Sequence, residues 1–112
     1  YILRMKEFIR GMMDTIILWL LFKKPMHGYE ILTKIKELTG IKFSSGSIYP
    51  LLYKLEKLGL IKGYWKKVSE RQRIRLYKVT KKGMIVLKNI SEYLQLFFKD
   101  LATFEKLNNM LI

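Results

Sequence analysis

The sequence contains no cysteine and only one histidine among its 112 residues. Without cysteine the chain has no disulfide, no thiolate zinc site and no cysteine nucleophile. One histidine and scattered carboxylates form neither a nucleophile–base pair nor a cluster of metal ligands. We therefore expect no enzyme activity, no metal and no cofactor. The lack of cysteine is also compatible with the reducing cytoplasm, where we expect the protein to act.

Long apolar runs are lacking as well. The longest spans residues 15–22 and is closed by Lys23-Lys24-Pro25. It falls far short of the roughly 20 residues that a membrane-spanning helix needs, and no small-residue cleavage site follows it, as one would in a signal peptide. We therefore expect no membrane-spanning segment and no membrane partner that would depend on one.

Acidic residues are also few. Lysine and arginine number 22 against 9 aspartates and glutamates, which gives a net charge of +13. Such an excess favours an anionic partner, either nucleic acid or an anionic membrane, and the alternative is a lysine-rich solvated surface. Nine of the basic residues lie between residues 62 and 82, where Glu70 is the only acidic residue. Because these charges do not lie opposite an apolar helical face, a membrane-surface role is the weaker interpretation.

Apolar periodicity and turn residues predict the order of elements. Half of the chain is hydrophobic, and 112 residues suit one compact unit. The expected elements are helices at 9–22, 27–38 and 48–58, strands at 61–68 and 73–80, and a final helix at 81–109. Three helices followed by a β-hairpin are the winged helix-turn-helix arrangement. The predicted fold class is mainly α with a small β-hairpin (α+β): a DNA-binding domain at 9–80 and a long C-terminal dimerisation helix at 81–112.

Several residues are expected to begin or end these helices. Gly40 is placed to end the second helix in a left-handed cap. His27 precedes a glycine at that helix's start, where a structural or capping role is favoured over a catalytic one. Ser47 is preferred over Ser45 as the N-cap of the third helix, because Pro50 then falls in the first turn, whose N–H groups have no helical partner. Thr80 is expected to cap the final helix.

The third helix is predicted to show a polar face to solvent. On a helical wheel its leucines and Ile48 gather on one side and its tyrosines and lysines on the other. Lysines supply charge to phosphates, and tyrosine hydroxyls hydrogen-bond phosphates or base edges. The alternative is that Tyr49 and Tyr53 only cover neighbouring helices. The candidate DNA-binding residues here are Ser45, Ser47, Tyr49, Tyr53, Lys54 and Lys57.

The hairpin supplies a second group of candidates. Arg71, at the polar tip spanning 69–72, is expected to enter a minor groove, while Lys66, Lys67 and Arg73 contact the DNA backbone. The strand register stays open: either Ile74 and Leu76 face inward, or Tyr77 and Val79 do. Arg75 is therefore a weaker candidate than Arg71 or Arg73.

The final helix carries an apolar stripe at alternating spacings of three and four residues. This heptad pattern is typical of a helix that pairs with another helix, and the helix is too long to be covered by its own domain. We expect a homodimer, whose two-fold symmetry would match an inverted-repeat DNA operator. The candidate dimerisation residues are Leu87, Ile90, Leu94, Phe97, Leu101 and Phe104.

Four segments together resemble one family of regulators. They are MHGYEI at 26–31, SGSIYPLL at 45–52, LGLI at 58–61 and YKVTKKG at 77–83, and they resemble the PadR family of winged helix-turn-helix transcriptional regulators. The resemblance covers roughly residues 9–83. It implies a dimeric repressor of bacterial or archaeal type, whose GSIYP helix and wing bind operator DNA. It also implies that the C-terminal helix packs with the partner's N-terminal helix. The tip at 69–72 departs from the Gly/Pro-containing turn of many members, which puts the wing's length and contacts in doubt.

Some family members release DNA when a small aromatic or hydrophobic effector binds between the subunits. The candidates for lining such a site here are Trp19, Phe22, Phe97 and Phe98, although aromatic residues at helical spacing more often belong to a core. Two other functions stay open: a nonspecific architectural DNA binder and a winged-helix module that binds proteins.

Overall fold

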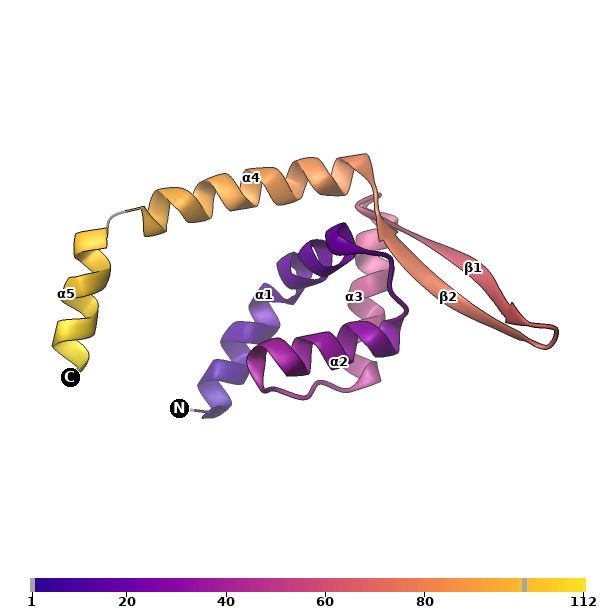
Figure 1. The fold of residues 1–112 in the computed structure, drawn as a ribbon, viewed down its shortest axis with the longest axis horizontal. Helices are drawn as coiled ribbons and strands as arrows, with labels where there is room; N and C mark the ends of the chain where they lie inside the picture. The colour runs from indigo at the N-terminus through magenta and orange to yellow at the C-terminus, as the bar shows by residue number, and fades with distance from the viewer. Residues whose placement is uncertain (1, 100) are drawn as a thin grey trace.

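The structure, a computed structural model, describes the backbone of residues 2–99 and 101–112 and the side chains of residues 5–99 and 103–112. Three helices come first, then a two-stranded hairpin, then two further helices (Figure 1). In chain order these elements are α1 (Ile2–Lys23), α2 (Gly28–Thr39), α3 (Ser45–Lys57), β1 (Ile61–Ser69), β2 (Gln72–Val79), α4 (Lys81–Phe98) and α5 (Leu101–Leu111). We call α1–α3 with the hairpin the body, and α4 with α5 the arm. The predicted fold class, mainly α with a winged helix-turn-helix and a C-terminal helical extension, is confirmed.

The hydrophobic core lies in the body. Its fully buried members come from all three helices and from the base of the hairpin, so that each helix contributes one apolar face. The buried residues are Met13, Ile17, Leu18, Leu20, Leu21, Met26, Ile31, Ile35, Phe43, Ile48, Leu52, Leu55, Leu60, Ile61 and Tyr77. Helix α1 begins seven residues earlier than the apolar pattern predicts.

The caps of α2 agree with the prediction. The Nδ1 atom of His27 accepts a hydrogen bond from the backbone N–H of Glu30 at 3.1 Å, which satisfies one of the free donors of the first turn. Gly40 ends the helix with a φ of 73°, a left-handed conformation that glycine adopts without a steric penalty. The single histidine therefore has a structural role in the fold.

The predicted N-cap of α3 is wrong. The helix begins at Ser45 with Ser44 as its N-cap, so Ser47 lies inside the first turn and Pro50 lies within the helix. The backbone N–H of Ser47 already bonds the carbonyl of Ser44 at 3.0 Å, which starts the helix before the proline. Proline cannot donate to the carbonyl of Gly46, four residues earlier. The helix tolerates this loss close to its exposed beginning.

The hairpin packs its base against the body. Its antiparallel register pairs Gly63 with Tyr77 and Trp65 with Arg75, and Tyr77 is buried. Of the two registers left open by the sequence, the structure has Tyr77 and Val79 facing inward. Tyr77 also exchanges two backbone hydrogen bonds with Met26, at 2.8 and 3.1 Å. A single isolated bridge thereby joins the segment between α1 and α2 to β2.

The single final helix predicted at 81–109 is wrong. Thr80 caps α4 as predicted, since its hydroxyl accepts from the N–H of Gly83, but α4 ends at Phe98 and α5 then runs at a steep angle to it (Figure 1). The rings of Phe98 and Phe104 lie 5.3 Å apart. On a continuous helix, residues six apart would point about 120° away from each other, so this contact depends on the bend.

Candidate nucleic-acid interface

The exposed face of α3 is a stripe at a spacing of four residues. Ser45, Tyr49, Tyr53 and Lys57 follow one another along the helix and all are exposed. The opposite face carries Ile48, Leu52 and Leu55 into the core, which fixes the stripe outward. This part of the predicted DNA-binding set is therefore brought together on one surface.

Tyr49 has a packing role as well. Its ring lies directly over Gly28 at the start of α2, where any added Cβ atom would come within 2.7 Å of the tyrosine hydroxyl oxygen. Nearly half of the Tyr49 side chain is nevertheless exposed. The HGYE and GSIYP segments are thus in contact, and a side chain at position 28 would require the Tyr49 ring to move. Tyr53, one turn further along α3, is 69% exposed.

Ser47 and Lys54 lie on a different edge of α3, the one that faces α1. The ammonium group of Lys54 pairs with a carboxylate oxygen of Asp14 at 2.8 Å. The other oxygen of Asp14 is buried and is without a hydrogen-bond partner in the described part of the chain. Lys54 is therefore held against α1 and not directed outward with Tyr53 and Lys57.

The hairpin separates the predicted wing residues into two faces. In an antiparallel pair, directly opposed residues point to the same side. Lys67 and Arg73 are opposed and share a face with the buried Ile61 and Tyr77, so they turn toward the α3 side. Lys66 points to the other face, opposite Ile74. Arg71 lies in the exposed two-residue tip.

A part-buried ion pair that sequence spacing does not predict fixes the hairpin to α3. One carboxylate oxygen of Glu56 accepts hydrogen bonds from the backbone N–H of Gly63 at 2.9 Å and from the guanidinium of Arg75 at 3.1 Å. The Arg75 guanidinium also lies 5.4 Å from the ring centroid of Trp65. A Cβ atom at position 63 would approach Arg75 to 2.7 Å, so the glycine leaves room for the arginine.

The predicted dimerisation residues divide between two environments. Leu87 packs partly against the body, and Ile90 is half-buried. Leu94 and Phe97 are exposed, Phe97 to 71%. Phe104 is half-buried beside Phe98, and the side chain of Leu101 lies outside the described residues.

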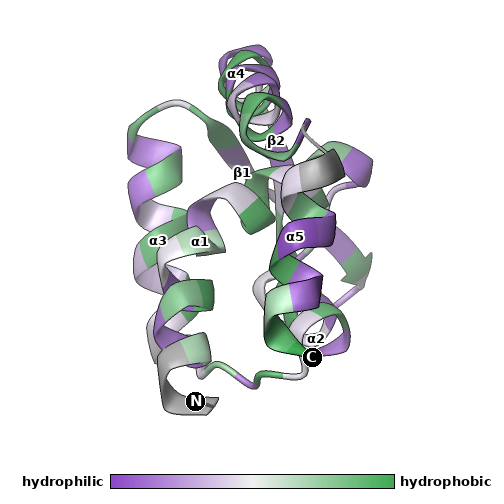
Figure 2. Cartoon of the chain, turned by 90° about the vertical axis from the view of Figure 1, so that its left-hand side faces the viewer, coloured by the Kyte–Doolittle hydropathy of each residue, from purple (hydrophilic) through white to green (hydrophobic). Residues whose placement is uncertain are grey.

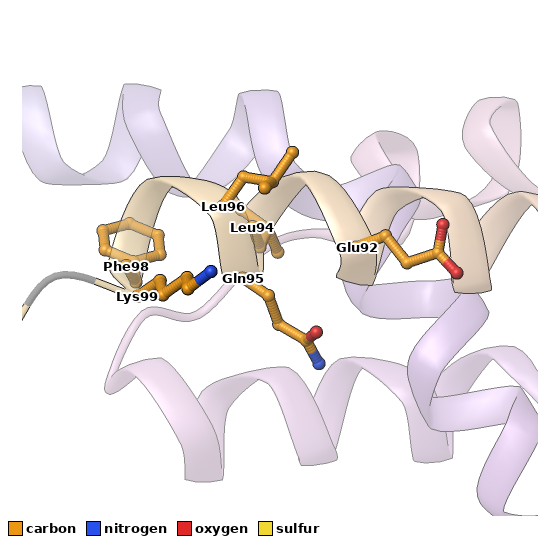
Figure 3. Close-up of a pocket in the computed structure, with 6 residues that line it drawn as sticks. All are labelled: Glu92, Leu94, Gln95, Leu96, Phe98 and Lys99. Carbon is orange, nitrogen blue, oxygen red and sulfur yellow. The ribbon is translucent and has the colours of Figure 1, made fainter.

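The end of α4 is apolar on its surface. Leu94, Leu96 and Phe98 line a shallow concavity with Glu92, Gln95 and Lys99, and Leu96 points to the opposite side of the helix from Gln95 (Figure 3). Helix α5 also carries hydrophobic residues (Figure 2), and its Leu107, Met110 and Leu111 are exposed. Three of the four aromatics predicted to line an effector site fall in two different cavities of the described residues. Trp19 and Phe22 line a cavity of about 400 Å³ between α1 and α4, whereas Phe98 lines the concavity at the far end of α4.

A second exposed apolar stripe runs along α1 and was missed. Met5, Phe8, Met12, Trp19 and Phe22 are all exposed, at spacings that fit a heptad pattern once Thr15 is included. The signal was present in the sequence. It was masked because the same helix also carries a continuous buried face, and because residues 1–8 were not assigned to any element.

The described residues meet the requirements of neither a metal site nor a membrane-spanning helix. Among them, no three histidine or acidic side chains come together as a metal site would require. Within the same residues, no helix combines the length and apolarity needed to cross a bilayer.

Comparison with known proteins places this architecture in one family. The family model of the PadR-like transcriptional regulators matches residues 17–89, more than half of the chain. An uncharacterized protein of Lysinibacillus sphaericus is 33% identical over 86 residues, which are 75% of this chain and 79% of that protein.

Solved structures agree with this match. A transcriptional regulator of Clostridium thermocellum is 34% identical, with a TM-score of 0.72 over 88% of this chain and 94% of that one. A PadR-like regulator of Bacillus cereus is 28% identical, with a TM-score of 0.76 over 94% and 96%. A PadR family regulator of Clostridium difficile is 29% identical, with a TM-score of 0.71 over 91% and 100%. The chain therefore belongs to the PadR-like family of transcriptional regulators.

Proposed function

We propose that this regulator is a sequence-specific DNA-binding repressor that inserts α3 into the major groove and lays its wing along the backbone. One arrangement supports the proposal: Tyr49, Tyr53 and Lys57 are exposed along α3, and the wing residues Lys67 and Arg73 lie on the same hairpin face as Arg75, which pairs with Glu56 of α3. Tyrosines suit base edges or phosphates, and the cations suit phosphates. Arg71 at the tip is assigned to the minor groove or the backbone.

The remaining candidate DNA-binding residues differ in how directly we expect them to contact the DNA. Ser45, on the exposed stripe, is assigned to the DNA, and Ser47 to phosphates at the edge of α3 that faces α1. Lys54 lies on the same edge, where its ion pair with Asp14 leaves it a smaller contribution to DNA binding. Lys66 faces away from α3 and is left with an electrostatic contribution at most. We propose that residues 9–80 form the DNA-binding domain and that residues 81–112 form the dimerisation region.

We further propose a homodimer formed through the arm. The exposed apolar residues at the end of α4 and those along α1 form two large surfaces that a monomer leaves in water. Pairing the arm of one protomer with α1 of its partner would bury both at once, with Leu94, Phe97, Leu101 and Phe104 at the contact. The two-fold symmetry of such a dimer would match an inverted-repeat operator. We propose that it binds this operator in the cytoplasm. An aromatic or hydrophobic effector would bind where Trp19 and Phe22 approach the partner's arm.

Fluorescence anisotropy tests the DNA-binding proposal. The wild-type protein is titrated at about 150 mM salt into a duplex from upstream of its own gene and into a scrambled duplex of equal length. A repressor with an operator there binds the first more tightly by about 10³-fold or more. If both bind equally, with a steep dependence on salt, selection from random duplexes separates a distant operator from an architectural binder. If neither is bound at low salt, the proposal fails and protein binding becomes the better account.

A further inference from the structure

A basic cleft lies at the beginning of α3, at the opposite end of that helix from the wing. Its cavity has a volume of about 290 Å³, and residues from α1, from the loop before α3 and from α3 itself surround it. Both ribbon views show that loop passing beside the N-terminal half of α1 (Figures 1 and 2). The lining residues are Lys6, Arg10, Lys42, Phe43, Ser44 and Ser47.

A buried aromatic ring forms the fixed base of this cleft. Lys6 and Arg10 are one helical turn apart on α1, and their charged groups lie 5.6 and 6.0 Å from the centroid of the Phe43 ring. Phe43 is only 3% exposed, so the core holds its position. The ring thereby keeps two cations close together that would otherwise move apart in solvent.

The charges of the cleft are not neutralised by the protein. The ion pairs of the described residues use other cations, namely Lys24, Lys34, Lys54, Lys67 and Arg75. Lys6, Arg10 and Lys42 form no ion pair among those residues, and the one carboxylate that follows on the same face of α1, that of Asp14, pairs with Lys54. Two hydroxyls complete the lining: the Oγ atoms of Ser44 and Ser47 lie 3.2 Å apart, so that one hydroxyl donates to the other, which is left to donate outward. Three free cations with this hydroxyl pair suit a phosphate group.

The cleft continues the edge of α3 that faces α1. Lys6, Arg10 and Asp14 follow one another at a spacing of four on α1, beside Ser47 and Lys54 of α3. At the wing end of this edge, Asp14 neutralises Lys54. At the other end the cations stay free. The unpaired charge of this edge is therefore concentrated in the cleft.

We propose that the cleft binds backbone phosphates of the DNA, beyond the bases read by α3 and on the side away from the wing. This inference rests on the proposed function and deepens it: each protomer would hold the duplex at three places, the wing, the α3 stripe and the cleft. Because the contact is to phosphate, it strengthens binding to any sequence and does not change which sequence is preferred.

The test removes charge from the cleft and keeps the carbon stems. The double variant Lys6→Gln/Arg10→Gln and the single variant Lys42→Gln are compared with Lys36→Gln/Lys106→Gln, a matched loss of two exposed charges outside the cleft. Anisotropy titrations from about 50 to 200 mM salt use the upstream duplex and the scrambled duplex. Each lost phosphate contact lowers the slope of log affinity against log salt by about 0.9. Circular dichroism and sedimentation check that fold and assembly are intact.

We expect the cleft double variant to lose about 10-fold in affinity for both duplexes and one to two units of salt slope, with the preference ratio unchanged. Lys42→Gln loses about half as much and leaves α1 untouched, so it decides the question if the double variant fails to fold. Affinity and salt slope equal to those of the matched control would overturn phosphate binding by the cleft. The proposed function would not be affected by that result. A wild-type protein that binds neither duplex overturns the proposed function itself.

Discussion

The body and the arm of this protein bury their apolar side chains to opposite extents. In the body, Leu52 of α3 is fully buried, as are the inward residues of α1 and α2. In the arm, Phe97 is 71% exposed and Met110 75%, and the one fully buried residue described in α4 is Gly83. The body therefore has a core of its own, beside the exposed stripe on α1, whereas the described part of the arm has an apolar surface and almost no buried side chain.

We therefore expect the stability of the body and that of the arm to depend differently on protein concentration. A self-contained core gives a stability that does not depend on protein concentration, whereas a surface covered by a second copy is stabilised by mass action. The joint between the regions is where α4 leaves the body, at Thr80 and Gly83.

The largest effect is expected from Gly83→Ala, which attacks this joint. An added Cβ atom would overlap the carbonyl oxygen of Leu60 and come within 2.7 Å of a methyl group of Val79. Because one neighbour is backbone, the helix must move, and we expect a loss of about 3 kcal/mol in the free energy of unfolding. Urea denaturation measures it.

Gly11→Ala is the matched control for that change. It is the same substitution in a helix, but nothing lies within 4 Å of the new atom. We expect it to stabilise the protein by about 0.5–1 kcal/mol through helix propensity. Equal effects at the two glycines would contradict a joint that is closely packed at position 83.

The next effect concerns the arm alone. Phe97→Glu places a charge on the exposed apolar surface, and we expect the dimer dissociation constant to rise about 100-fold, because the charge would have to be desolvated at the contact. Sedimentation velocity measures the dimer, and Asn89→Glu on the same helix serves as the control. A dimer that withstands Phe97→Glu would show that the arm is not the contact.

Within the body, Glu56→Gln tests whether the wing is held in place by α3. Glutamine keeps an acceptor for the Gly63 N–H but loses the charge that holds Arg75. The pair is about one-third exposed, so its stability effect is small, yet we expect a loss of about 5–10-fold in DNA affinity from misplacing the wing. Glu37→Gln removes the charge from an exposed pair with Lys34 and should change nothing. DNA affinity that is equal in both variants would mean that the wing does not need this contact.

The smallest expected effect is an increase. Asp14→Asn frees Lys54 from its ion pair and removes a negative charge beside the phosphates. We expect affinity for any duplex to rise about 3-fold at low salt, with little change in sequence preference. In the same assay, Lys54→Ala should cost less than Lys57→Ala. The reverse order would show that Asp14 does not withhold Lys54 from DNA.

Periodicity and turn chemistry were sufficient to predict the body from the sequence. Gly40 and Thr80 act as the predicted caps, and the hairpin lies where β-branched and aromatic residues gather. These signals are local, so one sequence contains them. The N-cap of α3 was misplaced because four neighbouring positions, Ser44 to Ser47, offer three serines, and local preference alone does not choose among them.

The wrong prediction of a single final helix and the two unpredicted ion pairs concern long-range geometry. Neither glycine nor proline marks the bend after Phe98, so no backbone signal separates α4 from α5. The pairings of Lys54 with Asp14 and of Arg75 with Glu56 join residues 40 and 19 positions apart. Sequence spacing does not encode such contacts, and they decide which candidate cations are free to bind DNA.

The measurement that tests the account most directly is a hydroxyl-radical footprint of the wild-type protein on its best duplex from a random selection. Two bodies joined by their arms predict two protected half-sites, related by a two-fold axis, with centres one helical turn of about 10–10.5 base pairs apart or a small multiple of it. Protection of a single half-site, or unbroken protection along the duplex, would contradict a dimer that reads an inverted repeat.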